Sequence, residues 1–222
     1  MYENLSFINC GGTYCYVIQG YQGDVLIDTG EKRYRNEIEM WLLNFNIKII
    51  ILTHGHNDCI ENAAYFSKLY NAEVYMTEAD YELAKNNMSR SFYACGLSGQ
   101  LISPAAFKIM KRQAEEFKVN FIHDGHILAT KYGIPCYIID LEGHTKGSIG
   151  VYYAEDLYVG DAVMNVVYPS FPYICESPKA ARRSIERFKD INPKRLLFTH
   201  GEPIETKHNK AYLNLFSKHV IM

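Results

Sequence analysis

The stretch IILTHGHNDCIEN, residues 50–62, carries the strongest indication of how this chain folds and what it binds. It begins with apolar residues of the kind that form a buried strand. His54, His56 and Asp58 then alternate along the chain, and Cys59 follows directly. Histidine and aspartate are common metal ligands, and here three of them crowd one turn. The stretch therefore predicts a metal site at the end of a strand.

Three later apolar runs end in the same residue types. The run CYIIDLEG leads into His144, DLYVG leads into Asp161, and KRLLFT leads into His200. Ligands at the ends of neighbouring strands can meet in one crevice, where open α/β sheets usually place their sites. A lone histidine at a strand end is more often only hydrogen bonded, so the hypothesis depends on the combination. Imidazoles with carboxylates suit zinc, iron or manganese.

The rest of the pattern alternates strands with helices, which is typical of an α/β protein. Strands are expected in 13–20, 24–30, 47–53, 73–76, 134–143, 147–154, 156–161 and 194–200. Helices are expected in 32–45 and 60–71, from Ser177-Pro178 through Ile191, and in 207–218.

The segment around 78–120 differs from its flanks, because its pattern is helical or loop-like. Thr77 and Asp80 resemble a capping box at the start of one helix. Ser103-Pro104 resembles the start of another. We interpret the segment as a helical insert. It is a candidate for a substrate wall, together with the aromatic stretch YPSFPY at 168–173, although packing explains both equally well.

Composition narrows the function classes. The chain has 222 residues, of which 48% are apolar and 22% charged, and a net charge of −2. This is an ordinary globular composition, and the scattered lysines and arginines do not indicate a nucleic-acid or membrane surface. No apolar run approaches the ~20 residues of a transmembrane helix. We expect a small-molecule substrate rather than nucleic acid or a membrane, and leave homo-oligomerisation open.

The six cysteines form no CxxC pair. The N-terminus lacks the charged and apolar regions of a signal peptide. We therefore expect reduced thiols and a cytoplasmic location.

The order of these motifs resembles that of the metallo-β-lactamase superfamily over nearly the whole chain. The family pattern is an early DTG, here Asp28-Thr29-Gly30, then His-x-His-x-Asp-His, GHTxGS, an aspartate after a strand and a late histidine. The resemblance implies a single domain over 1–222. It also implies an αββα sandwich, in which two mixed sheets pack face to face with helices outside, and to which the helical insert around 78–120 is added.

The resemblance also assigns roles to individual side chains. Ligands of a first metal ion would be His54, His56 and His144. Ligands of a second would be Asp58 and His200, with Asp161 bridging both ions. Asp28 resembles the buried support of the site, although a turn aspartate before Thr-Gly is an equally good interpretation.

Cys59 departs from the family pattern, which has a histidine at this position. A coordinating thiol is deprotonated and binds zinc well, so Cys59 could be a ligand of the second metal. Its soft sulfur would then favour zinc over manganese. It could equally be a small buried residue at the start of a helix, with the second site weak or empty.

The resemblance to glyoxalase II-like members implies a zinc-dependent metallo-hydrolase with two metal ions. A metal-bound hydroxide, oriented by Asp58, would attack the carbonyl of a thioester or lactone. A second interpretation is a mononuclear non-haem iron dioxygenase of the persulfide dioxygenase type. It would use His54, His144 and Asp161 as a two-histidine, one-carboxylate set. A third is a metal-stabilised binding protein without enzymatic activity.

Overall fold

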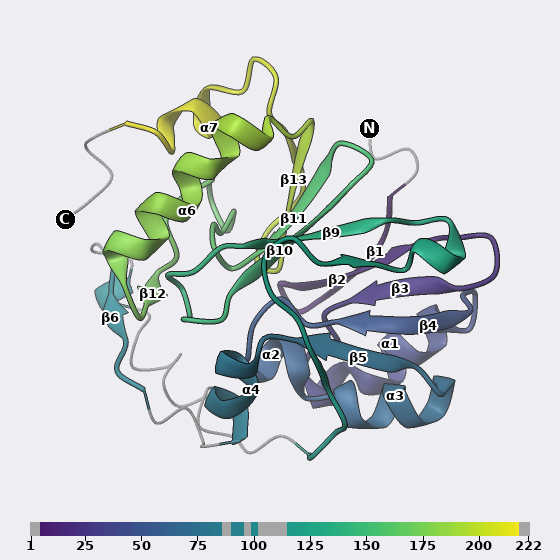
Figure 1. Ribbon diagram of the computed structural model, residues 1–222. Coiled ribbons are helices and arrows are strands. Elements are labelled where there is room, and N and C mark those ends of the chain that lie inside the picture. The colour runs from purple at the N-terminus through teal and green to yellow at the C-terminus, as the bar shows by residue number, and fades with distance from the viewer. Residues whose placement is uncertain (1–4, 86–89, 96–98, 102–114, 218–222) are drawn as a thin grey trace.

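The computed structural model describes residues 5–85, 90–95, 99–101 and 115–217 (Figure 1). In these residues, two six-stranded mixed sheets pack face to face with helices on their outer sides. The expected αββα sandwich is therefore confirmed.

The first sheet has antiparallel pairs at one edge and parallel pairs beyond β3. Its order is β1 (Ser6–Cys10), β2 (Thr13–Ile18), β3 (Asp24–Ile27), β4 (Ile47–Ile51), β5 (Glu73–Met76) and β7 (Asn120–Phe121). Its outer face carries helices α1 (Arg35–Leu42) and α3 (Ala63–Tyr70).

The second sheet is antiparallel except for the pair β11 and β13. Its order is β14 (Ile204–Glu205), β13 (Arg195–Phe198), β11 (Asp156–Gly160), β10 (Ile149–Tyr153), β9 (Cys136–Asp140) and β8 (Ile127–Leu128). Helices α6 (Pro178–Ile191) and α7 (Lys210–Asn214) cover its outer face (Figure 1).

Strand β4 shows why the apolar run before the metal motif is continuous. Ile49 and Ile51 belong to the core between the two sheets, whereas Ile50 and Leu52 belong to the core beneath α1 and α3. Because successive side chains point to opposite faces, a stretch buried on both faces is apolar at successive positions, as from Ile49 to Leu52. The strand ends at the edge of the sandwich where the candidate metal ligands lie.

The helical insert expected around 78–120 is found in part. Helix α4 (Glu78–Lys85) begins as expected, but Tyr93–Ala94 forms a strand, β6, which pairs with β12 (Ile174–Cys175). The helix expected at Ser103-Pro104 lies outside the described residues. The closing helix α7 is shorter than the predicted range 207–218. No helix among the described residues has the length and apolar character needed to cross a bilayer.

Candidate metal centre

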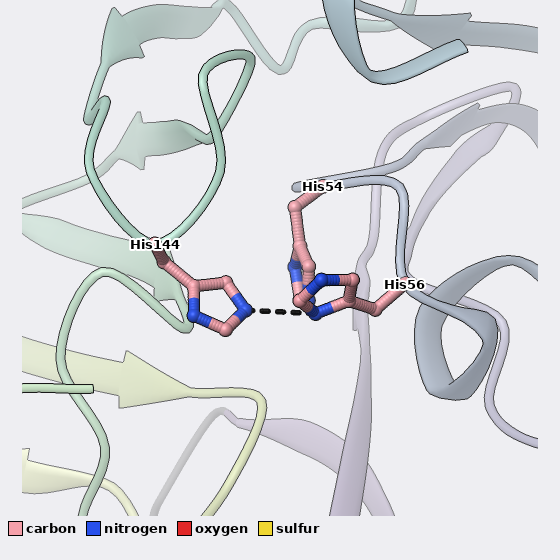
Figure 2. A group of neighbouring side chains, drawn as sticks. All are labelled: His54, His56 and His144. Atoms are coloured by element: carbon pink, nitrogen blue, oxygen red, sulfur yellow. Dashed lines mark hydrogen bonds between the residues drawn. The ribbon is translucent and has the colours of Figure 1, made fainter. Parts of the chain in front are cut away.

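Three buried histidines face one another at the edge of the sandwich (Figure 2). His54 and His56 come from the loop between β4 and the short helix α2 (Asn57–Ile60), and His144 comes from the loop between β9 and β10. Each offers a ring nitrogen, and these atoms lie within 4.8 Å of one another. Nε2 of His144 is 2.9 Å from Nδ1 of His56. The structure thus brings together the three side chains predicted for a first metal.

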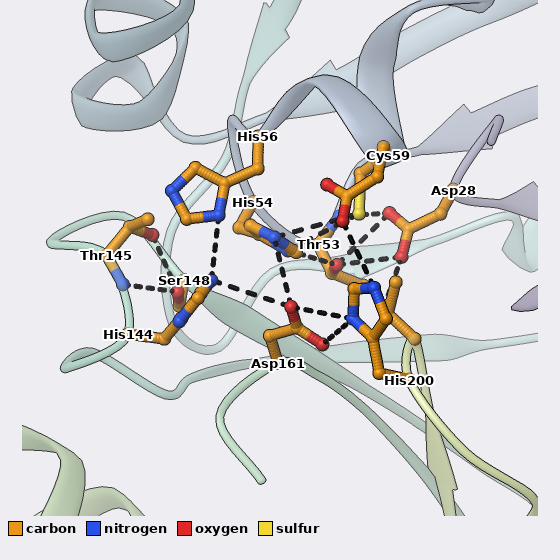
Figure 3. Close-up of polar contacts among 12 residues, drawn as sticks. Asp28, Thr53, His54, His56, Cys59, His144, Thr145, Ser148, Asp161 and His200 are labelled. Carbon is orange, nitrogen blue, oxygen red and sulfur yellow. Dashed lines mark hydrogen bonds and ion pairs between the residues drawn. The ribbon is translucent and has the colours of Figure 1, made fainter. Parts of the chain in front are cut away.

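A second group consists of Asp58, Asp161 and His200, again with ligand atoms within 4.8 Å. Nδ1 of His200 lies 2.8 Å from Oδ1 of Asp161, and Nε2 lies 3.2 Å from Oδ2 of Asp58. Asp161 also joins the two groups, because its Oδ2 is 3.7 Å from Nε2 of His54 and 3.6 Å from Nε2 of His144 (Figure 3). Asp161 thus lies between the two groups, and the bridging role that the family resemblance implies for it stays a prediction.

Hydrogen bonds orient two of the three histidines. Nδ1 of His144 donates to the carbonyl oxygen of Ile174 at 2.8 Å, which leaves Nε2 as the lone-pair nitrogen. Nδ1 of His54 lies 3.1 Å from the Thr53 hydroxyl, which in turn donates to Oδ2 of Asp28 at 2.8 Å. Such partners fix the tautomer of metal-ligating histidines. They were not predicted, although Thr53 lies beside the motif.

Asp28 is buried and serves as the acceptor beneath the site. It accepts bonds from the backbone and hydroxyl of Thr53 and from the hydroxyl of Thr199, residues that follow β4 and β13. Burial raises the pKa of its carboxyl. Its φ of 58° lies in the left-handed region, which is unusual for a residue other than glycine. These contacts favour the support role over that of an ordinary turn residue.

Burial sets the charge states of the histidines. It holds the pKa of His56 well below its ordinary value and, with His54 adding repulsion, lowers that of His144 to about 4. Both rings are therefore neutral at pH 7, the state in which imidazole binds a metal. His200 differs: burial disfavours its charge, but Asp161 and Asp58 raise its pKa well above the usual value.

Cys59 is fully buried, and its Sγ lies 3.5 Å from Nδ1 of His54 (Figure 3). Its Sγ lies within 4.8 Å of ligand atoms of His54 and Asp58. The group formed by Asp58, Asp161 and His200 does not include it. Burial raises the pKa of its thiol, and the charge of Asp28 raises it further. A coordinated metal would reverse this, because a coordinating thiol loses its proton. This geometry accommodates a metal-ligating thiolate and a buried packing thiol equally.

Asp80 is buried and accepts hydrogen bonds from two loops of the site, a role that the sequence did not reveal. Its carboxylate accepts bonds from the backbone N–H groups of Gly55 and Gly147, both at 2.9 Å, and from the hydroxyl of Thr145 at 2.5 Å. It thereby ties the loop of His54 and His56 to the loop of His144. Thr77 and Asp80 do not act as the two members of a capping box. The Asp80 carboxylate accepts bonds from these loops, and the Thr77 hydroxyl donates to the Gly147 carbonyl.

Two of these contacts require glycine. A Cβ at Gly55 would lie 2.5 Å from the backbone oxygen of Asp80, and one at Gly147 would lie 2.1 Å from the Thr77 hydroxyl. Any side chain at either position would therefore push α4 away from the loop of His54 and His56 or from the loop of His144.

The segment after α4 also reaches the site. Arg90 contacts Oδ1 of Asp80 at 3.0 Å and Oε1 of Glu176 at 3.0 Å. The ring of Phe92 lies 5.4 Å from the ring of His56. Neither residue belongs to a recognisable motif, so nothing in the sequence indicated them.

The donor set fits a divalent metal ion. It combines neutral imidazoles with buried carboxylates, and the Nε2 atoms of His54 and His144 are directed toward Asp161. In addition, His56 Nε2 and Asp58 Oδ1 are buried without a hydrogen-bond partner among the described residues. Buried polar atoms rarely lack a partner in native proteins, and a bound ion or water is one common explanation where they do.

Comparison with known proteins agrees with this geometry. A family model described as "Metallo-beta-lactamase superfamily" matches residues 8–200. No curated protein matches the sequence significantly. The prediction of a single domain over 1–222 stays a prediction.

Three solved structures show the same fold. A metallo-beta-lactamase family protein from Thermus thermophilus, TTHA1429, has a TM-score of 0.71 at 22% identity, covering 97% of this chain and 78% of its own. An archaeal superfamily protein from Sulfolobus tokodaii, ST1585, has a TM-score of 0.66 at 19% identity, and the match covers 98% of this chain and 88% of that protein. TTHA1623, described in a di-iron-bound form, has a TM-score of 0.65 at 19% identity, and the match covers 90% of this chain and 93% of that protein.

Proposed function

This chain belongs to the metallo-beta-lactamase superfamily, and on that premise we propose that it is a metal-dependent hydrolase acting on a carbonyl substrate of the thioester or lactone class. The superfamily generally comprises metal-dependent hydrolases. The observation that carries the proposal is the position of Asp161 between two groups of ligand-type side chains. Such a pair of groups suits two neighbouring metal ions, which we propose to be zinc.

Six side chains would hold the metals: His54, His56, Asp58, His144, Asp161 and His200. Cys59 is the proposed seventh. A bound ion would supply a Lewis acid and a water of lowered pKa. The protein's own contribution is positioning: Thr53 and the Ile174 carbonyl hold His54 and His144 in one tautomer. Asp58 Oδ1 has no hydrogen-bond partner among the described residues, so it can accept a hydrogen bond from the attacking water and orient it.

The surroundings favour a partly apolar substrate. Phe92 lies beside His56 on one side. On another, the backbone N–H of Asn165 donates to the His200 carbonyl, and the next residues, Val166 and Val167, are 54% and 79% exposed. Exposed apolar side chains beside a polar centre are typical of a site that orients the substrate through polar groups and binds the rest by apolar contact. We propose a small-molecule substrate, rather than nucleic acid or a membrane, and a cytoplasmic location.

Metal quantification combined with a hydrolysis panel tests the proposal. The purified protein should hold about two zinc ions per chain and cleave a thioester or lactone. Asp161→Asn should lose metal and hydrolysis together. His126→Ala, which changes a histidine outside both groups, should keep both. A metal-loaded protein that cleaves no thioester, lactone or phosphoester would refute the proposal and favour a binding role.

A mononuclear iron dioxygenase is the second candidate. The observation that favours it is that Nε2 of His54 and Nε2 of His144 both face the same oxygen of Asp161. Two histidines and one carboxylate are the ligand set of non-haem iron oxygenases. About one iron per chain, with oxygen consumed on addition of a persulfide, would establish this candidate and refute the hydrolase.

A further inference from the structure

Two cysteines from distant parts of the chain meet beside the metal centre. Sγ of Cys95 lies 2.8 Å from Sγ of Cys175, although 80 residues separate them. Cys175 ends β12, and Cys95 follows β6, its pairing partner (Figure 1). A disulfide bond measures about 2.05 Å, so the two sulfurs need to close by less than about 1 Å.

The backbone holds the two thiols in place. Ala94 pairs with Ile174, and the N–H of Cys95 donates to the Tyr173 carbonyl at 2.7 Å. Cys175 is fully buried, whereas Cys95 is partly exposed, so a small oxidant can reach one of the two sulfurs. The other four thiols are buried in the core. Cys95 is therefore the thiol that a dissolved oxidant reaches first.

We propose that Cys95 and Cys175 are a modification site, at which a low-molecular-weight disulfide converts the two thiols into an intramolecular disulfide. The Cys95 sulfur loses its proton and attacks one sulfur of oxidised glutathione, which forms a mixed disulfide and releases one glutathione. The Cys175 sulfur then loses its proton, attacks Cys95 Sγ and releases the second glutathione. The protein loses two electrons and two protons, and one oxidised glutathione becomes two reduced ones.

The bond would fasten together two segments that contact the metal ligands. Strand β12 provides the Ile174 carbonyl that orients His144, and the next N–H after the strand, that of Glu176, donates to the His144 carbonyl at 3.0 Å. The segment before Cys95 places Phe92 against His56. Oxidation therefore holds the Phe92 segment against the loop of His144. In the reduced protein the segment is joined by the two-residue ladder, the Cys95 N–H bond and the contact of Arg90 with Glu176, and the disulfide adds a covalent link to that short ladder.

Thiol counting and peptide mapping test the proposal on the full chain. After incubation with oxidised glutathione and alkylation, mass spectrometry should show two of the six thiols lost and a peptide pair linked through Cys95 and Cys175. Dithiothreitol should restore both thiols. Cys95→Ser should abolish the link without disturbing the fold, because Cys95 is partly exposed, and Cys136→Ala should keep it. Amide hydrogen exchange in β6 and β12 should be several-fold slower in the oxidised protein than in the reduced one.

Three results would overturn it: six thiols remaining at every oxidant concentration, a link through a different cysteine, or a reaction that stops at glutathione bound to Cys95. Circular dichroism of each variant separates loss of the link from loss of the fold. None of these measurements depends on hydrolysis, so the proposed function can fail while this inference holds.

Discussion

Cys59 lies against the ring of His54, with its Sγ 3.5 Å from Nδ1 and 3.7 Å from Nε2. The family resemblance assigns Cys59 to the second metal. The structure places it next to a ligand candidate of the first metal and also groups it with Asp58. A thiolate at this position would therefore lie close to both groups of donors.

The first prediction is that Cys59→Ala weakens the second metal. Removing one ligand should lower its affinity at least about tenfold and leave the first metal in place. Cobalt-substituted protein should show a thiolate-to-cobalt charge-transfer band that the variant lacks. Cys15→Ala, which removes another fully buried thiol outside the motif, is the matched control. Full second-metal occupancy in Cys59→Ala would show that Cys59 is a packing residue.

The second prediction concerns the link from Asp28 through Thr53 to His54. Thr53→Val removes the hydroxyl that contacts both of them. Loss of an outer partner typically lowers metal affinity about 10–100-fold, and a buried carboxylate that loses a donor costs about 1–3 kcal/mol of unfolding free energy. Metal titration and urea unfolding measure the two effects. Thr53→Ser should restore both, and an unchanged metal affinity in Thr53→Val would exclude the orienting role.

The sequence predicts the ligand-type residues well because each one follows an apolar strand run, and the ends of such strands gather at one edge. It does not predict what holds them there. The bond between Asp80 and Thr145 spans 65 residues, and the Ile174 carbonyl belongs to a two-residue strand with no periodicity to recognise. Arg90 and Phe92 lie in no motif at all. Local patterns record helices, strands and turns, whereas these contacts arise only when distant loops pack.

The third prediction follows from Asp80. Asp80→Asn replaces one carboxylate oxygen by an N–H donor, so one of the N–H groups of Gly55 and Gly147 loses its acceptor. We expect a loss of about 1–3 kcal/mol in unfolding free energy and a roughly 10–100-fold loss of metal affinity. Glu78→Gln, an exposed carboxylate on the same helix, is the control. Equal effects of the two substitutions would mean that Asp80 serves the helix rather than the metal loops.

The fourth prediction is a pH dependence that arises in the core between the two sheets. Burial between the sheets, with Asp156 nearby, raises the pKa of Tyr158 above its ordinary value of about 10. The unfolded chain therefore releases this proton first. The resulting stabilisation is present below pH ~10 and is lost as pH rises further, at about 1.4 kcal/mol per pH unit.

Tyr158→Phe should accordingly make the decline in unfolding free energy above pH ~10 shallower by about that slope. Urea unfolding at a series of alkaline pH values measures it. Tyr21→Phe is the control, because Tyr21 is 94% exposed. If both variants decline as steeply as the wild type, ionisation of Tyr158 is not coupled to unfolding.

The last prediction concerns substrate binding and depends on the proposed hydrolase. The Phe92 ring is 5.4 Å from the His56 ring and belongs to no ligand group, so it can contact a substrate's apolar part without holding metal. Phe92→Ala should raise KM for an apolar acyl thioester about tenfold, equivalent to about 1.4 kcal/mol of lost contact, and should change kcat little. Phe92→Leu should recover most of the loss, and Phe121→Ala, at a half-exposed ring on β7, should have no effect. A fall in metal content, or an equal rise in KM for a short polar substrate, would instead assign Phe92 to the support of His56.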